Sequence, residues 1–257
     1  MTDARERLSR LIELATQSAP EKQRALAFEL CDLLLDWPQR YPPTMREPFE
    51  ALLEKALRRL DGTTRRIIAA RLATSAETAV ALLNEFYFDM PVEARAGVLA
   101  RNAEIDASLR DGEKTADETP LIEAARVTRG VDFTQAFGRC LRIPVSTAQR
   151  IVDDTTGNAL AVACKGAHLR RATYSALALL TAAELRSDPS LRYSRLSSFD
   201  EIPETGAEGL LAYWRRPREN RASPELDAQM AETYPSVCTS ARSRVFANRT
   251  PGNLSEA

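Results

Sequence analysis

The segment from residue 131 to residue 185 carries the most regular pattern in the chain, and it limits the fold to packed helices. Apolar residues recur there at helical spacing in four successive short blocks, as on one face of an α-helix. The blocks are separated by turn chemistry such as the Ile143-Pro144 step, since the residue before a proline avoids the helical region. The pattern predicts four short helices, and the last, from His168, is apolar nearly all round and is therefore expected to be central.

Composition extends this expectation to the whole chain of 257 residues. Glycine is scarce, with 10 residues, whereas alanine and leucine are common, and that mixture favours helix over sheet. The same periodicity predicts a helix from Thr2 to Thr16 and a succession of further short helices up to residue 103. A rhythm of short helix, turn and short helix is typical of HEAT-type repeats. We therefore predict an all-α fold, either an irregular helical bundle or a short HEAT-like α-solenoid.

Polarity along the chain suggests three parts. Residues 1–103 are interpreted as N-terminal helical repeats, and residues 118–185 as a C-terminal unit of four to five helices. The polar stretch 102–117 between them is the candidate joint. Residues 186–257 form a polar tail with few core residues, in which 204–216 is the one candidate helix and would cover the apolar end of a helical stack.

Charge, cysteines and hydropathy narrow the class of protein further. Lys and Arg number 35 and Asp and Glu 36, so bulk charge does not attract the chain to nucleic acid or membrane. The four cysteines are far apart and form no C-x-x-C pair, which predicts reduced thiols and no metal clip. No apolar run is long enough to span a bilayer, and the N-terminus lacks a secretory pattern. We expect a cytoplasmic protein with no cofactor.

Core and cap residues between 133 and 180 carry a resemblance to a known group of proteins. The residues that carry the likeness are Phe133, Phe137, Leu141, Pro144, Arg150, Ile151, Val152, Asp153, Asp154, Gly157, Ala159, Leu160, Ala161, Cys164, Leu169, Tyr174 and Leu179. In these positions the chain resembles a family of uncharacterised bacterial proteins, built around a conserved domain of unknown function with HEAT-like helical repeats. The resemblance implies an all-helical, cytoplasmic, bacterial protein. It implies no activity and supplies no catalytic residues.

Residues that would indicate catalysis are missing from the sequence. No nucleophile elbow, P-loop, dinucleotide fingerprint or zinc-ligand spacing is present. The single histidine, His168, lies at a predicted helix start beside Arg170 and Arg171, where a surface or capping role is commoner than a catalytic one. The adjacent carboxylates Asp153 and Asp154 lack the further oxygen ligands of a calcium loop, and we interpret them as ending one helix and capping the next. We predict no catalytic, cofactor or metal residues and no enzyme activity.

A binding function remains, and two hypotheses describe it. The first is a protein–protein interaction or regulatory scaffold, in which a groove between helix pairs holds an unidentified partner protein by a few anchor residues. The alternative is a helix-turn-helix-like DNA-binding regulator that uses residues 137–152, although Asp153 and Asp154 would repel phosphate. The residues predicted to contact a partner or nucleic acid are Arg139, Arg142, Gln149, Arg150, Arg170 and Arg171.

Overall fold

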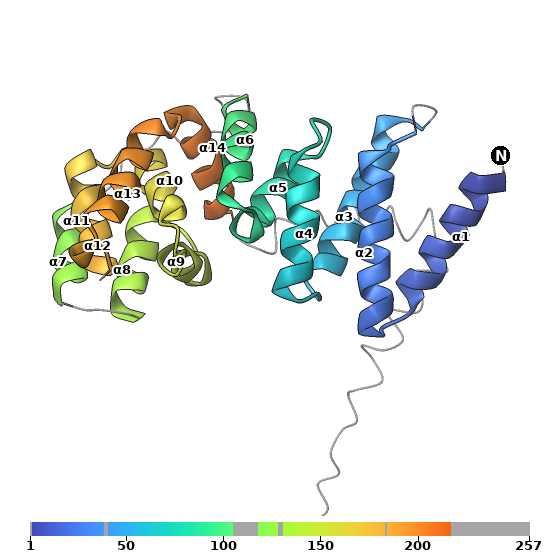
Figure 1. Cartoon of the computed structure of the whole chain (residues 1–257), viewed down its shortest axis with the longest axis horizontal. Coiled ribbons are helices and arrows are strands. Elements are labelled where there is room, and N and C mark those ends of the chain that lie inside the picture. The colour runs from blue at the N-terminus through green and yellow to red at the C-terminus, as the bar shows by residue number, and fades with distance from the viewer. Residues whose placement is uncertain (1, 39–40, 105–117, 128–130, 183, 217–257) are drawn as a thin grey trace, which may run out of the picture. The chain divides into compact units, whose positions relative to one another are not determined.

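The computed structural model describes residues 2–38, 41–104, 118–127, 131–182 and 184–216 (Figure 1). Over these residues it consists of helices joined by turns and contains no strand, which confirms the predicted all-α fold. None of the described helices is both long enough and apolar enough to cross a membrane. The contacts between residues group the chain into two compact units, with the boundary between Thr64 and Arg65. The joint predicted at 102–117 falls largely outside the described residues, and the contacts assign the helices before and after it to one unit.

The first unit is built around one leucine-rich helix. Its elements are α1 (Thr2–Thr16), α2 (Pro20–Leu35), the 3-10 helix η1 (Pro43–Met45) and α3 (Arg46–Leu57). Helix α2 contacts both α1 and α3. Its residues Leu30 and Leu34 are fully buried, as are Leu53 and Leu57 of α3. Burying such side chains contributes roughly 1.5–3 kcal/mol each relative to leaving them exposed, so this face holds the unit together.

The second unit contains the remaining described helices. They are α4 (Gly62–Ala73), which begins at the division, α5 (Val80–Glu85), η2 (Tyr87–Asp89), α6 (Val92–Ala103), α7 (Thr119–Val127), α8 (Val131–Leu141), α9 (Val145–Val152), α10 (Asn158–Gly166), α11 (Arg171–Thr181), α12 (Glu184–Ser187), α13 (Pro189–Glu201) and α14 (Glu204–Arg215). Helix α10 is central, because α9, α11, α13 and α14 all contact it. The prediction that the helix after His168 is central was wrong: Leu179 and Leu180 of α11 are only half-buried, whereas residues 159–164 of α10 are all buried.

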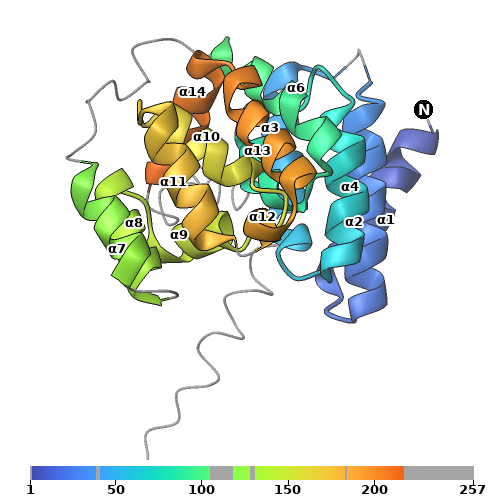
Figure 2. The same ribbon diagram turned by 60° about the vertical axis from the view of Figure 1, so that its left-hand side comes forward.

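Helix α14 lies between α6 and α10, and glycines allow a very close approach (Figures 1 and 2). A Cβ atom added at Gly206 would lie 2.2 Å from the carbonyl oxygen of Leu99 in α6. One added at Gly166 of α10 would lie 2.4 Å from the carbonyl oxygen of Ala207 in α14. The helices therefore touch backbone to backbone. The expectation that residues 204–216 only cover the end of a stack is replaced by a helix that belongs to the core.

The contact of α6 with α14 also bears on repeat architecture. In helical repeat proteins each repeat contacts only its sequence neighbours, whereas α6 and α14 are separated by the whole of α7 to α13. The second unit is therefore an irregular bundle at this point. HEAT-like repeats stay a prediction.

Helix α13 is a finding that the sequence interpretation missed, since residues 187–203 were assigned to the polar tail. The side chain of Asp188 accepts hydrogen bonds from the backbone N–H groups of Ser190 and Leu191, and Pro189 occupies the first turn. Both are strong helix-start features. Only Phe199 of α13 is buried, and its ring stacks on Tyr174 with the centroids 4.8 Å apart. One buried residue left almost no periodicity to detect, although the Asp-Pro start was readable.

Candidate functional site

Helices α8 and α9 form a tight pair, which is the region singled out as helix-turn-helix-like. Helix α8 ends with the N–H of Ile143 donating to the carbonyl of Gly138 at 2.9 Å and the N–H of Arg142 donating to that of Arg139 at 3.3 Å. This is the Schellman arrangement, in which the penultimate residue is left-handed and usually glycine. Here that residue is Arg142, with φ 57°. The motif helps to turn the chain into α9 within three residues, 142–144.

The outer face of this pair carries two arginines and an apolar side chain. Arg139, Arg142, Ser146 and Gln149 are exposed. Val145, at the first position of α9, is 50% exposed. We call these five residues the α8–α9 face. It offers guanidinium groups beside an unburied aliphatic group, a combination that suits an acidic and partly apolar partner.

Gln149 and Arg150, the two residues of α9 that were predicted to contact a partner, both interact with other residues of the second unit. Gln149 Nε2 donates to Asp153 Oδ1 at 2.8 Å. The guanidinium of Arg150 lies 4.4 Å from the ring centroid of Phe88 and 3.4 Å from Asp89 Oδ2. Arg150 therefore links α9 to η2 through a cation–π contact and an ion pair, which gives it a structural role.

Arg170 and Arg171, the last two residues predicted to contact a partner, lie at the start of α11 and form ion pairs with carboxylates. Arg170 Nε is 2.8 Å from Glu118 Oε2, and Arg171 Nε is 2.9 Å from Asp200 Oδ1. Glu118 also accepts from the Arg170 N–H and the Thr173 hydroxyl. Burial raises the pKa of Glu118, but these donors outweigh it and the pKa is lowered. The six predicted residues thus divide between two places, four on α8, α9 and the turn between them and two at the start of α11.

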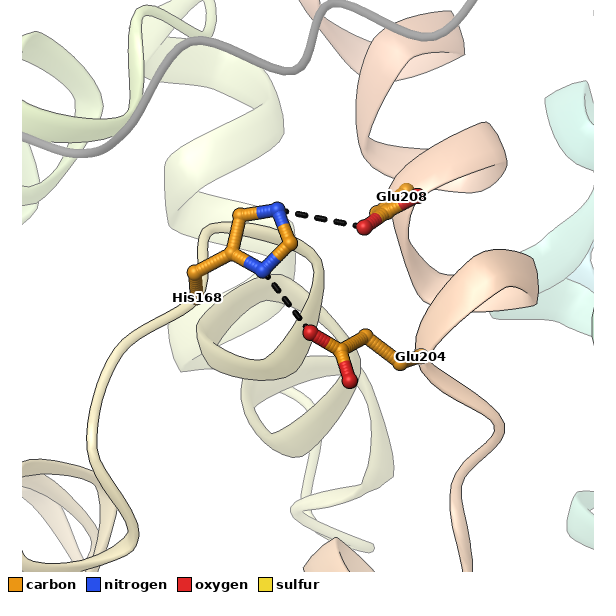
Figure 3. Close-up of side chains that lie close together, drawn as sticks. All are labelled: His168, Glu204 and Glu208. Atoms are coloured by element: carbon orange, nitrogen blue, oxygen red, sulfur yellow. Dashed lines mark hydrogen bonds and ion pairs between the residues drawn. The ribbon is translucent and has the colours of Figure 1, made fainter. Parts of the chain in front are cut away.

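A cluster that sequence reasoning did not predict lies where α10 ends beside the first turns of α14 (Figure 3). His168 Nδ1 is 2.9 Å from Glu204 Oε1, and His168 Nε2 is 3.1 Å from Glu208 Oε1. The side chains are 31%, 58% and 21% exposed for His168, Glu204 and Glu208. One potential metal-ligand atom from each lies within 4.8 Å of the others. We call these three residues the His168 cluster.

Local structure at the end of α10 places His168. The N–H of Leu169 donates to the carbonyl of Cys164, and the N–H of His168 donates to that of Lys165, both at 2.9 Å. This is again a Schellman arrangement, with His168 left-handed at φ 54°. The sequence interpretation that started a helix at His168 was wrong, because the residue closes α10 and α11 begins at Arg171.

Chemically, the cluster has two uses. With both ring nitrogens protonated, the imidazolium can donate to both carboxylates and pin the end of α10 to α14. With a neutral ring, one nitrogen and the two carboxylates are ligand types that bind divalent transition metals. Sequence spacing missed the cluster because 36 residues separate His168 from Glu204. The one readable signal was the i, i+4 spacing of Glu204 and Glu208.

A buried ion pair fixes the turn between α9 and α10. Arg95 Nη1 of α6 lies 2.8 Å from Asp154 Oδ2, and the two side chains are only 4% and 6% exposed. Asp154 also accepts from the N–H of Ala159, so its predicted capping role at the next helix is confirmed. The Arg95 guanidinium stacks 5.0 Å from the ring centroid of Tyr87, whose pKa is raised by burial. These charges are used inside the fold and hold α10 in place.

Comparison with protein-family models gives a match over most of the described helices. The family model described as an uncharacterised protein conserved in bacteria (DUF2336) matches residues 45–211. The match runs from η1 into α14 and includes both the α8–α9 face and the His168 cluster. Searches of the curated proteins and of the solved structures find no match.

Proposed function

Because the chain belongs to DUF2336, a bacterial family whose description names no activity, we propose from the site geometry that it is a binding module for a partner protein and not an enzyme. The observation that carries this proposal is the α8–α9 face. Arg139 and Arg142 are exposed there beside Val145, which is 50% exposed. Exposure of this aliphatic side chain to water is unfavourable. A partner that covers Val145 would remove this unfavourable exposure.

The partner that fits this face is a protein segment with carboxylates beside an apolar side chain. Arginine binds carboxylates through two parallel hydrogen bonds, which fixes orientation as well as charge. A buried apolar anchor would supply most of the affinity, and the arginines would add specificity and association rate. Consecutive helix pairs, such as α1 with α2 and α7 with α8, support the finer proposal of a HEAT-like scaffold.

Other reactive groups in the described part of the chain support a binding role over catalysis. Cys164 is a free, fully buried thiol, and burial raises its pKa, which disfavours the thiolate that a nucleophile needs. The buried side chains of Arg95 and Asp154 form an ion pair with each other. A buried free thiol also supports the proposed cytoplasmic location, where cysteines stay reduced.

DNA binding is the alternative, and the helix pair itself favours it. Arg139, Arg142 and Gln149 are exposed on that pair, as phosphate and base contacts require. The ion pairs of Arg150, Arg170 and Arg171 with carboxylates weigh against it, because those cations already have anionic partners. The exposed carboxylate of Asp153 at the end of α9 would face phosphate as well. We therefore prefer a protein partner.

Site-specific photocrosslinking tests the proposal. A photoreactive residue replaces Val145, and the purified chain is irradiated in lysate of a bacterium that encodes it. We expect one dominant protein adduct, reduced on the order of tenfold when Arg139→Glu and Arg142→Glu are combined. Arg126→Glu, at an exposed position on α7, is the matched control and should leave the adduct intact.

A gel-shift series with random duplex DNA runs beside it. A shift that fades steeply with salt and is lost in the double variant would replace the protein partner with the DNA alternative. Absence of both the adduct and the shift, in a chain with unchanged circular dichroism, would remove the α8–α9 face as a binding site. Arg150→Ala is not used, because its contacts with Phe88 and Asp89 make loss of fold the simpler result.

A further inference from the structure

We propose that the His168 cluster binds a divalent transition-metal ion of the Zn²⁺ class. The site lies on α10 and α14, so the proposal is independent of the partner proposed for the α8–α9 face. Its basis is that two helices bring one imidazole and two carboxylates together, with a ligand atom from each within 4.8 Å of the others. The three side chains face one another in Figure 3.

The donor set selects the class of ion. An imidazole nitrogen with two carboxylate oxygens suits Zn²⁺ and neighbouring transition metals, whereas Ca²⁺ and Mg²⁺ prefer oxygen ligands alone. Three protein ligands with further positions for water are the pattern of an open zinc site. The partial exposure of all three side chains leaves room for such water.

Each ring nitrogen of His168 lies beside one carboxylate, at nearly the separation that two ligand atoms of a shared ion would have. Zinc at about 2.0–2.2 Å from tetrahedral ligands places neighbouring ligand atoms about 3.3–3.6 Å apart. The contacts of His168 with Glu204 and Glu208 are 2.9 Å and 3.1 Å. One ring nitrogen binds the ion, so one glutamate must turn toward it. Glu204 is 58% exposed and has the space to do so.

Charge balance favours an ion over the ion pair alone. Glu204 and Glu208 lie four residues apart on one helix, where like charges repel. Within the described part of the chain their ion-pair partner is His168 alone. A protonated ring leaves one negative charge unbalanced, whereas a divalent ion with a neutral ring balances both carboxylates.

The packing beneath the cluster holds it in place. Gly166, two residues before His168, touches the backbone of Ala207 so closely that an added Cβ would lie 2.4 Å from the Ala207 carbonyl oxygen. Ala207 stands immediately before Glu208 and three residues after Glu204. A close contact therefore sets the spacing between the backbone segments that carry the histidine and the carboxylates, so that only side-chain rotation has to be fixed when an ion binds.

Metal titration of the full chain tests the proposal. The chain carries no polyhistidine tag, is stripped with chelator, and is titrated with Zn²⁺ in a calorimeter and with Co²⁺ in a spectrophotometer. We expect one equivalent to bind, with a cobalt spectrum lacking the intense thiolate charge-transfer band that binding by cysteines would give. Binding should also raise Tm, because it stabilises the folded state.

Three variants decide the outcome. His168→Asn keeps a residue that tolerates the left-handed backbone and removes the ring, and Glu208→Gln removes one ligand charge. Each should weaken the affinity for Zn²⁺ by roughly tenfold or more, while Glu201→Gln, an exposed carboxylate just before α14, should change nothing. The proposal is overturned if the wild-type chain binds no stoichiometric metal, or if binding persists in folded His168→Asn.

Discussion

The ends of α8 and α10 are closed by the same backbone motif, and their surroundings differ. Both helices end in a Schellman arrangement whose left-handed residue is not glycine, Arg142 with φ 57° and His168 with φ 54°. Such a residue costs about 1–2 kcal/mol relative to one that tolerates this conformation. Arg142 is exposed on the α8–α9 face, while His168 contacts Glu204 and Glu208 of α14.

A local motif and the residues packed against it have different effects at these two helix ends. At both ends the motif turns the chain. At the end of α8 nothing in the motif decides the role of Arg142. At the end of α10 a second helix approaches through Gly166 and supplies two carboxylates. The same turn therefore presents an exposed cation in one place and a potential ligand in the other.

The largest expected effect comes from a methyl group at the two helix ends. Gly166→Ala places Cβ 2.4 Å from the backbone oxygen of Ala207, and Gly138→Ala places it 3.2 Å from that of Ile143. We expect Gly166→Ala to lower the free energy of unfolding by about 3 kcal/mol, and Gly138→Ala by less than about 1 kcal/mol, because only the first must push two helices apart.

Urea unfolding measures both changes, with Gly97→Ala as the control. Nothing lies within 4 Å of a Cβ at Gly97, so that variant should be stabilised by roughly 0.5–1 kcal/mol. Equal losses for Gly166→Ala and Gly138→Ala would mean that α10 and α14 are not in backbone contact.

An intermediate effect is expected when the left-handed residues become glycine. Arg142→Gly should raise the free energy of unfolding by about 0.5–1 kcal/mol, since it removes the backbone cost at the price of some extra freedom in the unfolded chain. His168→Gly should gain less, because it also removes the contacts with Glu204 and Glu208. Thermal and urea unfolding of metal-free protein measure the difference. A gain of about 1 kcal/mol or more for His168→Gly would show that the His168 cluster adds no stability without an ion.

The smallest expected effect is a pH dependence of the stability. It arises from Glu118, which contacts Arg170 at the start of α11, just beyond His168. The pKa of Glu118 is lowered in the folded chain from its ordinary value of 4.5, so its contribution to stability is present above that value. It is lost as the pH falls below 4.5 through the lower folded pKa. Unfolding midpoints between neutral pH and about pH 3 should fall less steeply in Glu118→Gln than in the wild type. Glu123→Gln, exposed on α7, should keep the wild-type slope.

Local patterns in the sequence determined most of the helices. The helix predicted from Thr2 to Thr16 is α1 with the same bounds, and the predicted start at residue 204 is that of α14. Periodicity, prolines and caps act over one or two turns, so a single sequence is sufficient to reveal them.

The exposed contacts on α8 and α9 were also accessible from the sequence, because polar residues at the outer positions of an amphipathic helix are placed by the helix itself. That Arg150 instead contacts Phe88 and Asp89 was not accessible. Asp89, the ion-pair partner of Arg150, lies 61 residues away along the chain, and no local sequence pattern links the two positions.

Only the tertiary structure decided which helix is central and where the His168 cluster forms. Helix α14 reads as an ordinary amphipathic end helix, and its place between α6 and α10 depends on glycines whose neighbours lie far away in sequence. His168 reads as a helix start, whereas the fold makes it the end of α10 and sets two carboxylates against its ring. The sequence alone determined most of the helices, because they form by local hydrogen bonds and periodic burial, and long-range packing determined which side chains meet.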